Sequence, residues 1–228
     1  MPVMGSAAKP LNSPREGGGM VHQRVADKRK EIIDSAAALF ETEGYTITTM
    51  AAIARASGLA KASLYHYFAS KDEILFAIHE EFIGLLISRR DQRAATGLNP
   101  EDELREVFGD VFELMDSHRG HVRVFFEHYR ELPAAQQRVI RAKRDNYESW
   151  VEDTVRAGAA SGSFRDVDPR LVTLALFGMA NWSYQWYRSG GPLTSRQIAV
   201  HFWDYLIRGI EGPGPLASPS SWTEALVQ

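Results

Sequence analysis

The sequence has no cysteine among its 228 residues. This absence excludes disulfide bonds, thiol nucleophiles and thiolate metal ligands, and it fits a reducing cytoplasm. The chain also lacks any apolar run near the roughly 18 residues that suggest a membrane span. Its N-terminal region has no continuous hydrophobic stretch of the kind found in secretory signals. We therefore expect a cytoplasmic protein without a membrane partner, and a hydrophobic content of 44% is sufficient for a substantial core.

Signals of catalysis and of cofactor binding are missing as well. The sequence contains no nucleophile elbow and no glycine-rich phosphate loop. His118, His121 and His128 lie near Glu127, but Gly120 interrupts the helical pattern and no His-Glu-x-x-His arrangement occurs. We expect no enzymatic activity, no cofactor and no bound metal.

Charge is distributed unevenly along the chain, although the net value is only −3. Residues 1–71 contain 9 Lys/Arg and 6 Asp/Glu, a balance of +3, whereas residues 72–228 contain 17 and 23, a balance of −6. A basic N-terminal segment on an acidic body is typical of a nucleic-acid-binding module joined to a different kind of domain.

Apolar residues recur with helical spacing through most of the chain, and no segment shows the alternation of a β-strand. Gly, Pro and Ser are concentrated at both ends, where we expect a disordered arm over residues 1–22 and a flexible tail over residues 212–228. Ser70 with Glu73, and Asp168 before a proline, are typical helix starts. The expected helices cover residues 26–43, 49–57, 61–68, 71–90, 100–116, 121–129, 133–160, 169–188 and 194–209.

The segment SGLAKASLYHYFASKDEIL, residues 57–75, contains a very short helix with few apolar residues. Gly58 supplies the break after the preceding helix, and only Leu64 and Phe68 have the spacing of core residues. Three compact helices with a glycine-containing turn between the second and third are typical of a helix-turn-helix, whose second helix enters the major groove of DNA. The composition alone is equally compatible with a solvated surface helix in an ordinary bundle.

If this segment is a DNA-reading helix, its polar residues divide into those that contact bases and those that contact phosphates. Lysine and serine hydrogen-bond to base edges and a methyl group meets thymine, which gives a base-facing set of Lys61, Ala62 and Ser63. Side chains that lie where phosphates pass hold the backbone, which gives a second set of Tyr65, His66, Lys71, Thr48 and Thr49. Arg24, with Lys28 and Lys30, is expected to steer the N-terminal arm onto DNA. The expected partner is double-stranded DNA.

The wider segment TTMAAIARASGLAKASLYHYFASKDEIL resembles the DNA-binding segment of the TetR family of bacterial regulators. The matching positions are Thr48, Thr49, Ile53, Ala54, Gly58, Leu64, Tyr65, Phe68, Ser70, Lys71 and Asp72. Ala60 departs from the pattern, because a serine or threonine often caps the reading helix there, and one phosphate contact is thereby put in doubt.

This resemblance implies an all-α fold with two functional parts. An N-terminal three-helix DNA-binding domain with the helix-turn-helix would cover residues 23–70, and a helical ligand-binding and dimerisation domain would cover residues 71–211. The family's usual mode is a homodimer that binds a palindromic operator, represses transcription and is released by a small hydrophobic effector.

Two C-terminal segments are too apolar for helices that face water. Residues 170–188 are apolar almost all round, which predicts burial on every face, and the last helix carries a second apolar set. In one chain such helices leave a large exposed patch, whereas a symmetric dimer interface covers it. The alternative is that both helices lie in the central core of a monomer. A dimer would also place two reading helices about 34–36 Å apart, the spacing of successive major grooves.

Aromatic residues on the middle helices predict a ligand cavity, because such cavities are mostly apolar with a few polar anchors. The candidate ligand-binding residues are Phe112, Met115, Phe126, Tyr129, Arg144, Tyr147, Trp150, Met179, Trp182 and Trp186. An aromatic stripe of this kind is also common in a plain core.

The stretch NWSYQWYRSGGPLT, residues 181–194, is similar to one in TetR-type regulators of fatty-acid and steroid catabolism, many of which respond to acyl-CoA thioesters. This resemblance implies an acyl-CoA effector, whose phosphates need cations near the cavity mouth. Gln185 departs from some steroid-CoA-responsive members, which carry arginine there. The alternative function is that of an architectural DNA-binding protein without an effector, which predicts no cavity.

Overall fold

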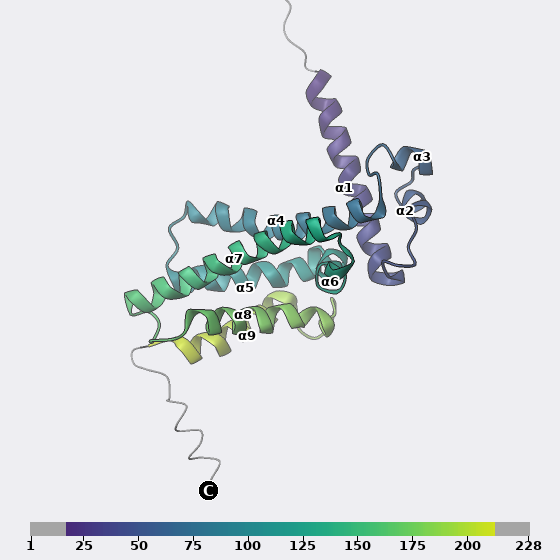
Figure 1. Ribbon diagram of the computed structural model, residues 1–228. Helices are drawn as coiled ribbons and strands as arrows, with labels where there is room; N and C mark the ends of the chain where they lie inside the picture. The colour runs from purple at the N-terminus through teal and green to yellow at the C-terminus, as the bar shows by residue number, and fades with distance from the viewer. Residues whose placement is uncertain (1–16, 213–228) are drawn as a thin grey trace, which may run out of the picture.

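Helices make up the architecture of the computed structural model, which describes residues 17–212 (Figure 1). In chain order they are α1 (Gly17–Glu43), α2 (Met50–Ala56), α3 (Lys61–Leu64), α4 (Lys71–Ala94), α5 (Pro100–Ser117), α6 (Arg119–Glu127), the 3-10 turn η1 (Tyr129–Glu131), α7 (Ala134–Ser161), α8 (Pro169–Trp182), the 3-10 turn η2 (Ser183–Gln185) and α9 (Ser195–Ile210). The extended pairing in this part of the chain is one isolated bridge between Phe164 and Glu211. The expected all-α fold is confirmed.

The expected helices occur where the sequence places them, and the differences fall at their ends. α1 begins at Gly17, so residues 17–22 of the expected arm are helical. The rest of that arm and the tail after residue 212 lie outside the described residues. α4 continues to Ala94 rather than to residue 90. The segment expected as one helix over residues 169–188 leaves the α-helical path after Trp182.

The early end of α8 follows from contacts made by the residues after it. The Ser183 hydroxyl donates to the Met179 carbonyl at 2.8 Å, and the tight turn η2 begins there. The Tyr187 hydroxyl donates to the carboxylate of Asp116, at the end of α5, at 2.5 Å. The Ser195 hydroxyl, at the start of α9, donates to the same carboxylate. The bonds to Asp116 therefore hold this segment away from the axis of α8. The apolar spacing of the segment could not predict this break, because Asp116 is about 70 residues earlier in the sequence.

The first three helices share one small apolar core. Phe40 of α1, Ile53 of α2, and Leu64 and Phe68 around α3 are each at most 1% exposed. Gly58 takes the left-handed backbone (φ +66°) that ends α2 and turns the chain toward α3. The expected helix-turn-helix geometry is therefore present, with Leu64 and Phe68 anchoring the short helix.

α4 joins this small domain to the rest of the molecule (Figure 1). Its cap is the Ser70 side chain, which accepts from the Glu73 N–H at 3.1 Å, while the Glu73 carboxylate accepts from the Ala69 N–H at 2.7 Å. The expected capping pair thus forms, with its return bond one residue before the cap. Further along, α4 packs against α1, α6 and α7. α4 is therefore in contact with both the DNA-binding helices and the body.

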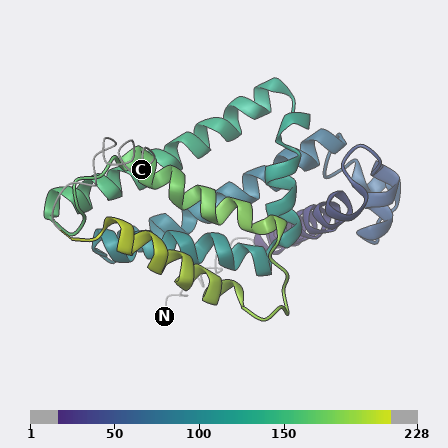
Figure 2. The ribbon, with the colours of Figure 1, turned by 90° about the horizontal axis from the view of Figure 1, so that it is seen from below.

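In the body, α5 lies centrally and contacts α4, α6, α7, α8 and α9. Figure 2 shows α9 running alongside α5 at one edge of the molecule. Phe108 and Phe112 of α5 are fully buried, and Trp203 of α9 packs edge-on against Phe108 at 6.1 Å between ring centroids. Among residues 17–212, no helix combines the length and the apolarity needed to cross a membrane.

Candidate DNA-binding surface and ligand cavity

The outward face of α3 carries the residues expected to read bases. Lys61 and Ala62 are exposed and Ser63 is half-buried, while Leu64 between them and the core is fully buried. Lys61 forms no ion pair with any residue of the described chain. Tyr65 is 47% exposed and His66 is also exposed. Ala60 contributes no side-chain cap, as expected from its departure from the family pattern. The short helix therefore presents a cation, a methyl group and a hydroxyl to solvent.

The two threonines before α2 have different roles. Thr48 is 1% exposed, and its hydroxyl donates to the Gly44 carbonyl at 2.8 Å. Thr49 is exposed and caps α2 by accepting from the Ala52 N–H at 3.1 Å. Because the Thr48 hydroxyl faces the protein, only Thr49 of this expected pair offers a side chain to a phosphate.

Lys71 is also engaged inside the protein. Its ammonium donates to the carbonyls of Tyr45 at 2.7 Å, Thr48 at 3.0 Å and Thr46 at 3.3 Å, and lies 4.3 Å from the centre of the Tyr45 ring. Three carbonyl acceptors satisfy all three ammonium donors. Lys71 therefore clamps the start of α4 to the loop after α1, in place of the expected phosphate contact.

Of the three cations expected to guide the N-terminal segment, only Arg24 is free of a partner among the described residues. Lys28 donates to the Ser57 carbonyl at 2.9 Å, and Lys30 pairs with Glu81 of α4 at 2.9 Å. Arg24 lies on the exposed first part of α1. It remains the side chain of this group best placed for a nucleic-acid contact.

A narrow cavity lies between α4, α5, α6, α7 and α8. Its volume is only about 30 Å³, which is room for one or two water molecules. Three of the expected ligand-binding residues line it. Its full lining is Phe82, Ile83, Leu86, Val111, Phe125, Phe126, Arg144, Tyr147, Glu148, Phe177 and Asn181. The walls are mostly aromatic and aliphatic, with a few polar groups, as ligand cavities are.

A wider outer cavity adjoins the narrow one. It has a volume of about 390 Å³ and is lined by Phe125, Phe126, Glu127, Tyr129, Arg130 and Arg144. Phe125, Phe126 and Arg144 line both cavities. The Arg144 guanidinium lies 5.6 Å from the Phe125 ring centre and 5.8 Å from that of Tyr129, and no carboxylate of the described chain pairs with it. The two cavities thus share two aromatic walls and a cation that no carboxylate of the described chain neutralises.

Tyr147 brings a buried hydroxyl to the inner cavity. The residue is 2% exposed, and its hydroxyl has no hydrogen-bond partner within residues 17–212. Burial raises the pKa of this phenol above its ordinary value, with a further contribution from Asp110. The hydroxyl is therefore neutral and able to donate a hydrogen bond to a guest.

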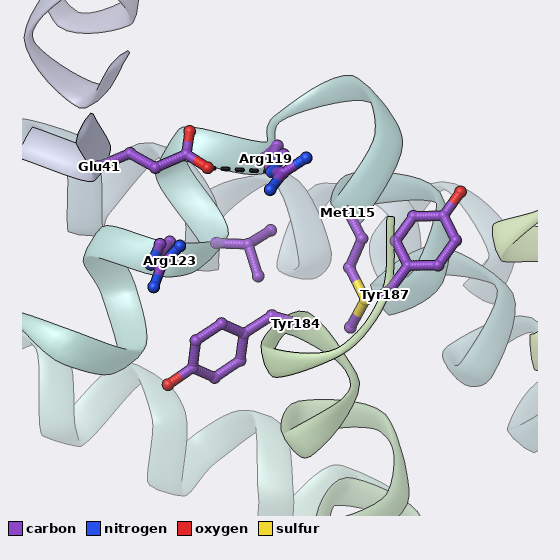
Figure 3. Close-up of a pocket in the computed structure, with 7 residues that line it drawn as sticks. Glu41, Met115, Arg119, Arg123, Tyr184 and Tyr187 are labelled. Atoms are coloured by element: carbon purple, nitrogen blue, oxygen red, sulfur yellow. Dashed lines mark hydrogen bonds and ion pairs between the residues drawn. The ribbon is translucent and has the colours of Figure 1, made fainter. Parts of the chain in front are cut away.

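The other expected ligand-binding residues lie elsewhere. Phe112 is buried in the α5–α9 core, with its ring 5.7 Å from that of Phe202. The Trp150 ring lies tilted against that of Tyr147, at 5.6 Å between ring centroids, and Met179 is half-buried on α8. Met115 points into a separate crevice of about 10 Å³, between Arg119 of α6 and the tyrosines Tyr184 and Tyr187 (Figure 3). This crevice holds at most one water molecule.

Trp182 and Trp186 lie on an outward apolar face of α8 and α9. We call this the α8–α9 face. Its side chains are 42–66% exposed and comprise Leu171, Leu174, Trp182, Trp186, Leu193, Val200 and Tyr205. A group of exposed apolar side chains of this kind is typical of an interaction surface.

Several cavity residues were not expected from sequence. Phe82, Ile83 and Leu86 form one helical stripe of α4, which reads as ordinary core. The other unexpected lining residues include Val111 of α5, Glu148 of α7, and Phe177 and Asn181 of α8. The stripe itself was visible in the sequence, but nothing in it distinguishes a cavity wall from a packed interface.

A cluster of ionisable groups lies where α1, α4 and α6 meet. His121 Nε2 is 3.6 Å from Asp34 Oδ1 and 3.8 Å from Glu81 Oε2, while Lys30 reaches the other Glu81 oxygen. His121, followed by Lys30, lowers the pKa of Glu81 to about 2 against the opposing effect of burial. Asp34, Glu81 and His121 bring three potential metal-ligand atoms within 4.8 Å of one another. The histidines grouped in the sequence, by contrast, are not joined into one cluster: His128 pairs with Glu131 instead.

Comparison with known proteins gives matches over both parts of the molecule. The model for bacterial regulatory proteins of the tetR family matches residues 32–78, and the model for the tetracyclin repressor-like C-terminal domain matches residues 97–210. The HTH-type transcriptional repressor KstR2 of Mycobacterium tuberculosis (strain CDC 1551 / Oshkosh) is 32% identical over 195 residues, covering 84% of this chain and 96% of that protein.

Solved structures agree with these matches. The structure of the ketosteroid transcriptional regulator KstR2 of Mycobacterium tuberculosis has a TM-score of 0.75 at 30% identity and covers 81% of this chain and 95% of that one. The crystal structure of AibR in complex with isovaleryl coenzyme A and operator DNA has a TM-score of 0.72 at 28% identity and covers 79% and 98%. The family matches and the overall fold therefore agree, and the chain belongs to the TetR family of bacterial transcriptional regulators, which are not enzymes.

Proposed function

We propose that this protein is a ligand-responsive repressor that binds a palindromic operator as a homodimer and is released by an acyl-CoA thioester. The observation that carries the proposal is the pair of adjoining cavities that share Phe125, Phe126 and Arg144. DNA recognition is assigned to α3, dimerisation to the α8–α9 face and effector binding to these cavities.

Operator binding is supported by the partition of side chains on α3. Lys61 and Ser63 offer hydrogen-bonding groups to base edges, and Ala62 offers a methyl group to thymine. Tyr65, His66 and Thr49 lie exposed around them and suit phosphate contacts. A helix of four residues makes few base contacts, so a second copy at the neighbouring major groove is needed for a useful affinity.

The α8–α9 face supports dimerisation. Leu174 of α8 is 50% exposed and Val200 of α9 is 57% exposed, and both lie among other exposed apolar side chains. A two-fold interface between identical faces buries this surface on both chains at once. The apolar pattern of residues 170–188 predicts burial on every face, and a dimer would cover the face that is exposed in one chain.

The chemistry of the two cavities supports a thioester of coenzyme A. The inner cavity offers aromatic walls to an acyl group, and the outer cavity offers Arg144 and Arg130 to phosphates. The inner volume of about 30 Å³ is far below the 300 Å³ or more of typical ligand cavities. An acyl group must therefore displace half-buried rings such as Phe126 and Phe177. AibR, of the same family, has been solved with isovaleryl coenzyme A.

The route from cavity to DNA runs along α4. Phe82, Ile83 and Leu86 form one wall of the inner cavity, so a guest that widens the cavity pushes on this helix. At its other end α4 is attached to the loop between α1 and α2 by the Lys71 clamp. A shift of α4 then changes the spacing of the two reading helices in a dimer. The effector must bind the DNA-released state more tightly, since equal affinity for both states shifts nothing.

Direct binding tests the effector assignment. We expect isothermal titration with CoA thioesters of differing acyl groups to show saturable binding by at least one, with free coenzyme A binding more weakly. Arg144→Gln is expected to weaken binding by about tenfold, the cost of one charge-assisted contact. Arg138→Gln, an exposed arginine on the same helix outside both cavities, is the matched control.

The contrary result supports the alternative, an architectural DNA-binding protein without an effector. If no CoA thioester binds, and if Arg144→Gln and the wild type have the same affinity for DNA under all conditions, the effector assignment is wrong. The lining of the two cavities argues against this alternative. Both place aromatic side chains around Arg144, which has no carboxylate partner in the described chain.

A further inference from the structure

Three groups from different helices converge at the junction of the DNA-binding domain with the body. Asp34 belongs to α1, Glu81 to α4 and His121 to α6. His121 Nε2 lies 3.6 Å from Asp34 Oδ1 and 3.8 Å from Glu81 Oε2. These separations exceed a hydrogen bond but suit atoms that would share one central ion with bonds near 2 Å.

The histidine is the unusual member of this cluster. His121 is only 3% exposed, and its Nε2 is fully buried without a hydrogen-bond partner among residues 17–212. A buried polar atom left unpaired costs free energy and calls for an explanation such as an ion. Here the unpaired nitrogen faces two carboxylates, which is the arrangement of a ligand set.

The donor types point to a particular class of ion. One imidazole nitrogen and two carboxylate oxygens suit Zn²⁺ and related first-row divalent ions better than Mg²⁺ or Ca²⁺, which prefer all-oxygen ligands. A cavity of about 250 Å³ lies against the cluster and is lined by Asp34, His121, His118 and Lys30, among others. It provides an entry path and space for water as a fourth ligand.

We propose that Asp34, Glu81 and His121 form a binding site for a divalent transition-metal ion of the zinc class. Such an ion would cross-link α1 of the DNA-binding domain to α4 and α6 of the body. The site is separate from the effector cavities and its existence does not depend on the proposed effector. Metal binding at this site would fix the angle between the DNA-binding domain and the body.

The Lys30 ammonium competes with a metal ion for the carboxylates of Asp34 and Glu81. This ammonium lies 2.9 Å from Glu81 Oε1 and 3.4 Å from Asp34, so both carboxylates are partly neutralised without a metal. The Lys30 side chain is 54% exposed and can turn into solvent when an ion enters. Removal of this charge is therefore expected to tighten metal binding rather than weaken it.

The test is titration of the full-length protein, stripped with EDTA, by Zn²⁺ in calorimetry and by Co²⁺ in visible absorption spectroscopy. We expect one saturable ion per chain, a d–d absorption band with Co²⁺, and a melting temperature that rises with Zn²⁺. His121→Gln and Asp34→Asn should each weaken Zn²⁺ binding by about tenfold or more. Loss of a residue that only supports a metal ligand already weakens binding by about this much, and loss of a ligand itself should cost at least as much. His128→Gln, from the pair with Glu131, is the control and should bind as the wild type does.

A gain of affinity separates ligand loss from misfolding. Lys30→Met should bind Zn²⁺ several-fold more tightly than the wild type, with an unchanged circular dichroism spectrum. The proposal is overturned if the wild type shows no saturable Zn²⁺ binding, if His121→Gln binds as tightly as the wild type, or if Lys30→Met binds more weakly. In each of these outcomes the cluster is a salt-bridged contact and nothing more.

Discussion

Lys61 and Lys71 show how identical side chains near one DNA-binding surface acquire different roles. Lys61 stands on the exposed side of α3 without a carboxylate partner in the described chain, whereas Lys71 has all of its donors on backbone carbonyls. An ammonium already bonded three times has little to give to a phosphate. The reading surface is therefore narrower than the motif suggests, and its charge at α3 depends mainly on Lys61.

Lys61→Ala should separate DNA binding from stability. We expect the affinity for operator DNA to fall by about tenfold or more, since a base or phosphate contact of this kind contributes about 1–3 kcal/mol. The free energy of unfolding in urea should be unchanged, because Lys61 has no internal partner in residues 17–212. Fluorescence anisotropy with a labelled promoter fragment measures the affinity. An affinity equal to that of Arg138→Ala, a cation removed from the far helix α7, would show that α3 does not read DNA.

At the scale of helices, the ends of α8 and α9 are fixed by one carboxylate on α5. Tyr187 and Ser195 both donate to Asp116. Burial would raise the pKa of Asp116, but the hydrogen bonds from Ser195 and Tyr187 outweigh it and lower the pKa below its ordinary value. The segment between α8 and α9 is thus held to the body through an ionised aspartate.

This arrangement predicts a pH dependence. A carboxyl group whose pKa is lower in the folded state contributes stability above its unfolded pKa, near 3.9, and loses it as the pH falls through the lower folded value. We expect residues 183–195 to exchange amide hydrogens faster in Asp116→Asn than in the wild type at pH 7. The two proteins should converge only once the pH has fallen below the lowered folded pKa of Asp116. Equal exchange rates at pH 7 would show that Asp116 does not hold this segment.

The proposed dimer interface on α8 and α9 gives a further prediction. Val200→Glu places a charge in the middle of the α8–α9 face, where Val200 is 57% exposed in one chain. We expect this substitution to convert a dimer into a monomer in light scattering, since a buried unpaired charge costs several kcal/mol. Operator affinity should fall with it. Val139→Glu, an equally apolar and 44% exposed position on α7, should leave the mass unchanged, and a monomeric wild type would contradict the assignment of this face.

On the scale of the whole molecule, the helices and their order follow from local chemistry. Apolar spacing, glycine breaks and the caps Ser70 and Asp168 place the helices in the right order, with the largest errors at the start of α1 and the end of α8. The reading face of α3 is predictable for the same reason, because Leu64 and Phe68 define the buried side and leave the rest outside.

Features made by distant residues could not be predicted in this way. The Lys71 clamp depends on backbone carbonyls of the preceding loop. The direction of these carbonyls cannot be predicted from the side chains of the loop. The cavity wall on α4 looks like ordinary core until α6 and α7 pack beside it. The junction of Asp34, Glu81 and His121 joins three helices far apart in sequence, so spacing rules for metal ligands cannot detect it.

α4 connects all of these features, since it forms a wall of the cavity, carries Glu81 of the junction and begins at the helix-turn-helix. We propose that a guest between Phe82 and Phe126 changes the position of the reading helices through α4. Because coupling between sites of this kind is typically about 1–3 kcal/mol, the effect on DNA affinity should be about 5- to 150-fold.

The most direct test is the anisotropy of a labelled DNA fragment from the protein's own promoter region, with the protein bound and CoA thioesters added. We predict that at least one thioester releases the wild-type protein, that the same thioester releases Arg144→Gln only at about tenfold higher concentration, and that free coenzyme A releases neither. DNA that stays bound at saturating concentrations of a thioester shown by calorimetry to occupy the protein would contradict the account.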